Sequence, residues 1–320
     1  MNAVYPDDCY MRFVDACNSH TKGLVYIAAM YHDVIDPFET TRSYLVEFDF
    51  KNTNKNCKVI IDGSKIGEGS KSEFSCLCHD LDGFVYIGGN NGFFKFNGTS
   101  LEFIDIDSLN KRREIICCAR AIGNDIFFGD SGGGVIEYFE GELDRSQLNK
   151  VDNNPNWIDG VHGWHNSSVI AVGVKGLVAK RTNSKWEVIP SPSNESLKTV
   201  WVVDDKDIYI GGKSGFAWRW DGDRRWIRLK VKTKSEYDIT FMDFAWYENF
   251  LYAAACTDGL YRLEGDTFVP VTDIGSACVS KLSITDSGLI GLGNVWGEYG
   301  NWITHFDGQK WAAHQINVAV

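Results

Sequence analysis

The sequence has little proline and no long hydrophobic run. Only 6 of its 320 residues are proline, and no stretch is of low complexity, so we expect no disorder beyond the termini. Nowhere do about 18 apolar residues follow one another, which argues against a transmembrane helix. The first residues, MNAVYPDDCYMRF, have neither a basic nor an apolar segment, so we expect no secretion signal. These absences predict a soluble, cytoplasmic protein that does not bind membranes.

A disulfide framework is also missing. The nine cysteines are an odd number, and most of them fall inside expected strands: Cys76, Cys78, Cys117, Cys118, Cys256 and Cys278. Buried free thiols in a reducing cytoplasm explain this pattern. Cys76 and Cys78 share one face of a strand, but the sequence offers no third and fourth metal ligand. We expect core cysteines, no metal and no cofactor.

Positive charge is in deficit. There are 32 Lys and Arg against 43 Asp and Glu, which gives a formal net charge of −11 and a pI near 5.1. Nucleic acid as a partner is disfavoured, because phosphate binding needs a basic face. The balance favours a protein partner with a basic surface.

A glycine-punctuated unit recurs along almost the whole chain. Its clearest copy spans Asp207 to Leu229, DIYIGGKSGFAWRWDGDRRWIRL, in which three short apolar runs are separated by glycine turns. Such a pattern predicts an antiparallel meander. The turn residue returns at Gly98, Gly141, Ser184, Gly222, Gly265 and Gly308, with spacings of 43, 43, 38, 43 and 43 residues.

Periods of about 40 to 45 residues are typical of propeller blades. We therefore predict an all-β protein, a seven-bladed β-propeller of four-stranded antiparallel blades, as one domain over residues 1–320 and without a fixed partner subunit. The expected blades span approximately 9–63, 74–106, 114–143, 157–190, 198–230, 239–271 and 278–316. Tyr5 or the C-terminal residues are candidates for a strand that closes the ring.

The repeat resembles the bacterial propeller repeats of the WD40/YVTN/BNR-like group, particularly the photosystem-assembly-factor type. The resemblance is clearest in IAVGVKGLVAKRTNSKWEVI and IYIGGKSGFAWRWDGDRRWIRL. It implies the architecture but not the function, because propellers include binding proteins and unrelated enzymes.

Candidates for catalysis are few. The P-loop, GxGxxG, HExxH, GxSxG and paired CxxC motifs are absent from the sequence. His162 and His165, with Asp159 nearby, are candidates for metal binding or proton transfer, yet residues three apart on a strand point to opposite faces. Four acidic residues at expected inner-strand ends are candidates for a metal site in the channel: Asp80, Asp204, Asp205 and Asp243. They match no motif, and we assign no catalytic residue.

Long loops are expected on one face of the ring, where the second and third strands of each blade connect and the chain crosses between blades. Recognition usually resides on such loops. Insertions in blades one and seven, YHDVIDPFETTR and NVWGEYGN, belong to neighbouring blades once the ring closes. They combine aromatic and acidic residues that we predict to bind a protein partner: Tyr31, Asp33, Asp36, Phe38, Glu39, Trp296, Glu298 and Tyr299. Packing of these aromatics on their own insertions is the alternative.

The sequence thus favours a non-catalytic, protein-binding propeller. An acidic propeller of this kind suits a bacterial immunity-type protein that neutralises a basic toxin through charge complementarity. Two alternatives stay open: an enzyme with a channel site, such as a metal-dependent hydrolase or lyase, and a carbohydrate-binding propeller.

Overall fold

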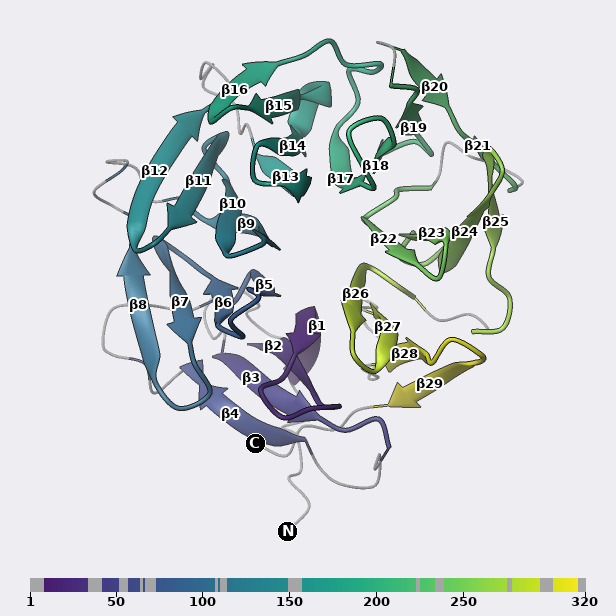
Figure 1. Ribbon diagram of the computed structural model, residues 1–320. Coiled ribbons are helices and arrows are strands. Elements are labelled where there is room, and N and C mark those ends of the chain that lie inside the picture. The colour runs from purple at the N-terminus through teal and green to yellow at the C-terminus, as the bar shows by residue number, and fades with distance from the viewer. Residues whose placement is uncertain are drawn as a thin grey trace.

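Seven β-sheets, each folded from one continuous stretch of chain, surround a central channel in the computed structural model (Figure 1). The structure describes residues 9–33, 42–51, 57–63, 66, 73–106, 109, 114–148, 157–222, 225–233, 239–274, 278–293 and 302–315. The sheets follow the ring in chain order, so blade seven lies beside blade one. This arrangement confirms the predicted seven-bladed, all-β propeller.

In each blade the first strand lies at the channel and the fourth at the rim. Blades one to four contain β1 (Cys9–Asn18), β2 (Val25–Asp33), β3 (Arg42–Phe48), β4 (Lys58–Asp62), β5 (Cys76–His79), β6 (Val85–Gly88), β7 (Gly92–Phe96), β8 (Leu101–Asp105), β9 (Ile116–Ile122), β10 (Asp125–Asp130), β11 (Gly134–Phe139), β12 (Glu142–Gln147), β13 (Ile158–His165), β14 (Ser168–Gly173), the short 3-10 helix η2 (Val174–Gly176), β15 (Val178–Thr182) and β16 (Lys185–Val188). Blades five to seven contain β17 (Leu197–Val202), β18 (Ile208–Gly212), β19 (Ala217–Trp220), β20 (Trp226–Arg228), β21 (Lys230–Val231), β22 (Asp243–Tyr247), β23 (Phe250–Ala254), β24 (Leu260–Glu264), β25 (Thr267–Pro270), β26 (Lys281–Thr285), β27 (Gly288–Leu292), β28 (Trp302–Phe306) and β29 (Trp311–Gln315).

The periodic turn residues all join the third and fourth strands of a blade and all have positive φ, from +59° at Gly265 to +92° at Gly98 and Gly308. Ser184 adopts the same conformation, with φ +64°. A φ in this range favours glycine, which lacks the Cβ that crowds the backbone there. The repeat in the sequence is therefore the repeat of one turn.

We expect Gly222→Val to destabilise the protein by about 1–3 kcal/mol, because valine at φ +79° is strained. A Cβ at this position would also lie 3.0 Å from the Cβ of Lys206. Urea unfolding of the variant measures the loss. Ser184→Gly, at the equivalent turn of blade four, is the matched control and is expected to gain up to about 1 kcal/mol. An unchanged unfolding midpoint for Gly222→Val would contradict the assigned turn.

Blade six differs from the predicted four antiparallel strands. The short strand β21, which leaves blade five, pairs in parallel with β25 and makes this sheet five-stranded. The backbone N–H groups of Lys230 and Lys232 donate to the carbonyls of Asp266 and Phe268 at 2.9 and 2.8 Å. This pairing covers an outer edge strand, which would otherwise expose unpaired backbone groups.

The ring closes through side chains of blades one and seven. A hydrophobic cluster joins Phe13 and Phe48 of blade one to Ile290 and Ile303 of blade seven, and all four are buried. At the same junction the Asp286 N–H donates to Asn18 Oδ1 at 2.8 Å. Both blades already have four strands. Tyr5 and residues 316–320, the candidates for a closing strand, lie outside the described residues.

The hydrophobic core is divided among the interfaces between blades. One cluster, for example, joins Ala28 and Leu45 of blade one to Leu77 and Ile87 of blade two. Because each blade buries its two faces against its neighbours, apolar packing between adjacent blades stabilises the whole ring. No described helix is long and apolar enough to cross a membrane.

Candidate functional site

Six of the eight predicted partner-binding residues lie outside the described part of the chain: Asp36, Phe38, Glu39, Trp296, Glu298 and Tyr299. Tyr31 and Asp33 belong to the end of β2, where their backbones pair with Met11 and Cys9 of β1. The strands that lead into the two insertions, β2 and β27, belong to neighbouring blades, as predicted. The role of the eight residues stays a prediction.

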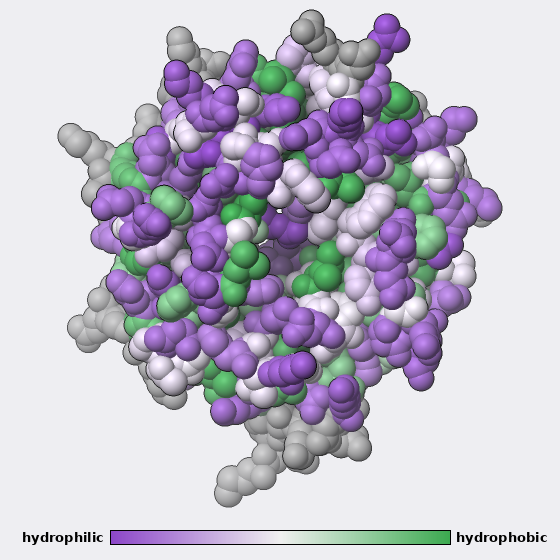
Figure 2. Space-filling model, viewed as in Figure 1, coloured by the Kyte–Doolittle hydropathy of each residue, from purple (hydrophilic) through white to green (hydrophobic). Residues whose placement is uncertain are grey.

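The central channel contains an enclosed chamber. Its chamber has a volume of about 270 Å³ and is lined by all seven first strands. Figure 2, viewed along the channel, shows hydrophilic residues inside the central hollow and hydrophobic ones beside it. A first strand is an edge strand, so backbone groups on its free side need partners other than a further strand.

Side chains of the first strands supply those partners across the junctions between blades. Each of four side chains accepts a backbone N–H of the following blade: Asp15 from Leu77 at 3.0 Å, His162 from Val202 at 3.1 Å, Thr199 from Phe244 at 2.9 Å, and Asp243 from Leu282 at 3.0 Å. Polar residues in the channel therefore stabilise the ring itself.

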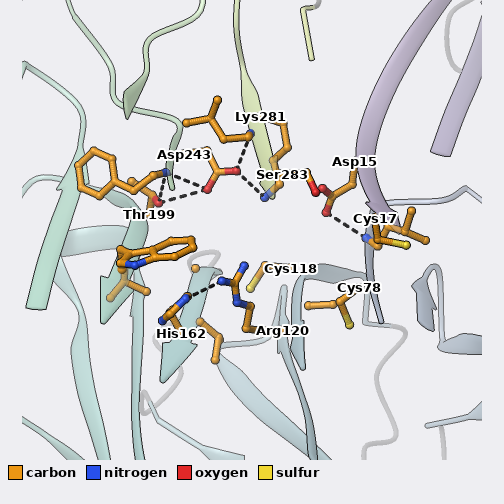
Figure 3. Close-up of a pocket in the computed structure, with 18 of the residues that line it drawn as sticks. Asp15, Cys17, Cys78, Cys118, Arg120, His162, Thr199, Asp243, Lys281 and Ser283 are labelled. Atoms are coloured by element: carbon orange, nitrogen blue, oxygen red, sulfur yellow. Dashed lines mark hydrogen bonds and ion pairs between the residues drawn. The ribbon is translucent and has the colours of Figure 1, made fainter. Parts of the chain in front are cut away.

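Charged residues in the chamber also pair with one another. Lys281 Nζ lies 3.4 Å from Asp243 Oδ2 (Figure 3), and Lys198 Nζ lies 3.0 Å from Asp159 Oδ1. Each pair joins neighbouring blades. In a hollow enclosed by protein, such pairing offsets part of the cost of removing charges from bulk water.

The surroundings of these groups shift their pKa values. Burial raises the pKa of Asp15 to about 6, although Lys281 opposes the shift. Because this folded-state pKa exceeds the ordinary value, the contribution of Asp15 to stability falls as pH rises from about 4 to about 6. Burial alone would lower the pKa of Lys281, but the carboxylates of Asp243 and Asp15 outweigh burial and raise that pKa. Lys281 thus stays protonated at neutral pH.

A second hollow of about 400 Å³ adjoins the chamber at the end of the channel where first and second strands connect. It contains Trp164, of which 60% is exposed, together with Trp246 and the buried Trp201. We call this hollow the aromatic mouth. By the blade topology it lies at the opposite end of the channel from the ends of β2 and β27, the strands that lead into the two insertions.

The catalytic candidates do not form a catalytic group. His162 is buried in the channel, whereas His165 is exposed and bonds to the Ser167 hydroxyl. Of the four acidic candidates only Asp243 lines the chamber. Asp80 and Asp204 accept backbone N–H groups within turns, and Asp205 bonds to Ser168. Within the described ranges, no three His, Cys, Asp or Glu side chains are placed to hold one metal ion.

Six of the eight described cysteines are buried, as expected, whereas Cys117 and Cys256 are half-buried. Cys76 and Cys78 lie in the cluster between blades two and three, whereas Leu77 packs on the opposite face of β5. The eight cysteines whose side chains are described are free thiols. Burial raises the pKa of Cys76 and of Cys78 well above the ordinary value, which leaves both as unreactive neutral thiols.

Sequence reasoning missed four channel residues: Asp15, Arg120, Lys198 and Lys281. The signal available was a charged residue in an otherwise apolar first strand. Lys198 and Lys281, like Asp159 and Asp243, stand at the first or second position of their strands in blades four to seven. Aligning the blades by their first strands, rather than by their turns, would have revealed Lys198 and Lys281, whereas Asp15 and Arg120 stand later in their strands.

Comparison with known proteins identifies one curated relative. No protein-family model matches the chain. Over 156 residues the chain is 26% identical to the immune protein Tsi7 of Pseudomonas aeruginosa strain PAO1, a match that covers 48% of this chain and 47% of Tsi7. The chain is thus a distant homologue of Tsi7, and the match spans about half the length of that relative.

Solved structures share the fold at low sequence identity. The WD40 propeller domain of Doa1 superposes with a TM-score of 0.60 at 10% identity, over 98% of this chain and 94% of that domain. YCF48 bound to D1 peptide gives 0.58 at 12% identity, over 99% and 97% of the two chains. The designed protein Ika8 gives 0.57 at 11% identity, over 98% and 99%. These likenesses confirm the resemblance to WD40 and photosystem-assembly-factor propellers and concern the fold alone.

Proposed function

We propose that this propeller is an immunity-type protein that binds and neutralises a toxin without catalysing a reaction. The observation that carries the proposal is the identity of 26% with the immune protein Tsi7 over 156 residues. The pairing of charged channel residues with one another supports a structural rather than a catalytic role for them. We further propose that the protein acts as a monomer in the cytoplasm.

The partner surface should be basic. The net charge of −11 attracts a cationic protein, and long-range attraction speeds association. We place the contact on the insertions of blades one and seven, around Trp296 and Phe38. Aromatic anchors surrounded by carboxylates are a common form of interface hot spot.

Co-purification followed by a rescue assay tests this function. The tagged protein is isolated from its own host, and proteins that co-purify are identified by mass spectrometry. Each one is then expressed in a test bacterium with and without the propeller. We expect one partner that stops growth alone and fails to do so when the propeller is co-expressed. Recovery of only an assembly or structural complex, none of whose members is toxic, would exclude the toxin-neutralising function.

Reversing the charges of the insertion should mainly slow association. For Asp36→Lys combined with Glu39→Lys we expect the association rate constant to fall about tenfold at low salt and to depend less on ionic strength, because peripheral charges steer the encounter. The dissociation rate constant should change little. Surface plasmon resonance with the identified toxin measures both. Asp204→Lys, at an exposed turn of blade five, is the control for net charge, and an equal effect there would argue against a local role for the insertion.

A further inference from the structure

Arg120 of β9 and His162 of β13 stand where the charged chamber meets the aromatic mouth. Both residues line both hollows, as does Trp201 of β17. Figure 3 shows the Arg120 and His162 side chains directed toward each other, across the channel from Asp243 and Lys281. A group entering through the mouth therefore meets this pair before it reaches the ion pairs of the chamber.

Hydrogen bonding at His162 leaves one donor without an acceptor. The ring is 7% exposed, and burial beside Arg120 holds the pKa of His162 well below its ordinary value, so the imidazole is neutral and carries one N–H. The Val202 N–H points at Nδ1 from 3.1 Å, and Arg120 Nη2 lies 2.6 Å from Nε2. Both nitrogens thus face a donor, but only one of them can accept.

The backbone decides which nitrogen accepts. The Val202 N–H is fixed by strand β17, so Nδ1 accepts its hydrogen bond and the ring proton resides on Nε2. Nε2–H and the Arg120 N–H groups then converge on one point. Two converging donors repel each other. Because Nη2 and Nε2 lie only 2.6 Å apart, an acceptor has to take both N–H groups from the side, with the Arg120 side chain rotating to make room.

The positive charge of Arg120 is not matched by a contact with an acid. None of the ion pairs among the described residues includes Arg120. Its Cζ instead lies 4.6 Å from the Trp201 ring, which also packs on His162 with ring centroids 4.2 Å apart. The tryptophan therefore holds both side chains in place, and the carboxylates of Asp243 and Asp15 act on Arg120 only through space.

We propose that the channel binds a carboxylate between Arg120 and the Nε2–H of His162. The planar fork of a guanidinium matches a carboxylate, with which it can form two parallel hydrogen bonds. The aromatic mouth, of about 400 Å³, has room for a small free carboxylate or for an aspartate or glutamate side chain of a bound peptide. This proposal does not depend on toxin binding and can fail or succeed alone.

Titration of the unaltered protein with sodium formate, at constant ionic strength against sodium chloride, tests the site. Histidine ¹H–¹⁵N spectra should show the Nε2–H tautomer of His162 and a saturable shift of its ring signals on adding formate. We expect binding in the millimolar range, as suits a ligand of so few atoms. The exposed His165 should not respond. The absence of a saturable shift at His162, or an equal shift at His165, would overturn the proposal.

Variants and larger probes extend the test. In Arg120→Gln the affinity for formate should fall at least tenfold, and in His165→Gln it should not change. An affinity in Arg120→Gln equal to that of the unaltered protein would count against the site.

Two further probes distinguish the possible sources of the carboxylate. Acetate represents a free carboxylate, and N-acetylaspartic acid α-amide represents an aspartate side chain in a peptide. Binding of both assigns the site to peptide side chains as well, and binding of acetate alone assigns it to free carboxylates. Failure of formate and both probes to bind rejects the site.

Discussion

Lys281→Met is expected to destabilise the protein by about 3 kcal/mol, since it leaves Asp243 in the channel without its cationic partner. The value is at the lower end of the range for buried ion pairs, because 30% of the Lys281 side-chain surface remains accessible to water. Urea unfolding at neutral pH measures the loss. Adding Asp243→Asn should recover part of the stability, because the second substitution removes the unpaired charge.

The loss of folding stability in Lys281→Met should also depend on pH. Without Lys281, the pKa of Asp15 rises further above its ordinary value, since Lys281 lowers it now. A raised carboxyl pKa means that the folded state binds the proton more tightly than the unfolded state, so the variant gains stability as pH falls from 7 toward 5. The difference in free energy of unfolding between the natural sequence and Lys281→Met should therefore be smaller at pH 5 than at pH 7. Lys310→Met, at an exposed turn of blade seven, is the control and should change stability by less than about 0.5 kcal/mol at either pH.

The fold was predictable because each blade repeats a local requirement. Positions such as Gly141 and Gly222 need a positive φ whatever the rest of the molecule does, and their spacing reports the length of one blade directly. Ser184 shows that the conformation, not the glycine itself, is what repeats. The fifth strand of blade six was not predictable, because β21 is only two residues long and its partner belongs to the next blade.

The channel was less predictable because its contacts join different blades. Lys281 and Asp243 are paired across 38 residues of sequence, and Asp15 bonds to Leu77 across 62. A charge in an apolar first strand is the one local signal, and it does not show which distant residue that charge contacts. Only the closed ring places all the first strands around one hollow, and that closure decides which charges are enclosed.

The two ends of the propeller offer different chemistry to a ligand. The end with the short turns has the aromatic mouth and the converging donors of Arg120 and His162. At the other end, β2 and β27 lead into the insertions of blades one and seven, which we propose as the partner contact. The two proposals therefore concern separate places on one scaffold and can be tested with different substitutions.

Trp296→Ala is expected to weaken partner binding roughly 30-fold or more, which corresponds to about 2 kcal/mol. A large aromatic side chain at the centre of an interface loses its whole buried area when truncated to alanine. Stability should hardly change, because Phe13, Ile290 and Ile303 already pack the junction of blades one and seven. Isothermal titration calorimetry with the identified partner and urea unfolding of the free protein measure the two quantities separately.

Trp157→Ala provides the matched control for that experiment. Trp157 is 44% exposed and precedes β13, the first strand of blade four, which lies across the ring from blades one and seven, so its truncation should leave affinity unchanged. A large loss of stability in Trp296→Ala with unchanged affinity would show that this tryptophan belongs to the core of the ring. The partner would then have to contact the connections between other blades, Asp144 to Asn156 and Val231 to Asp238, where Trp157→Ala would be the first variant to lose affinity.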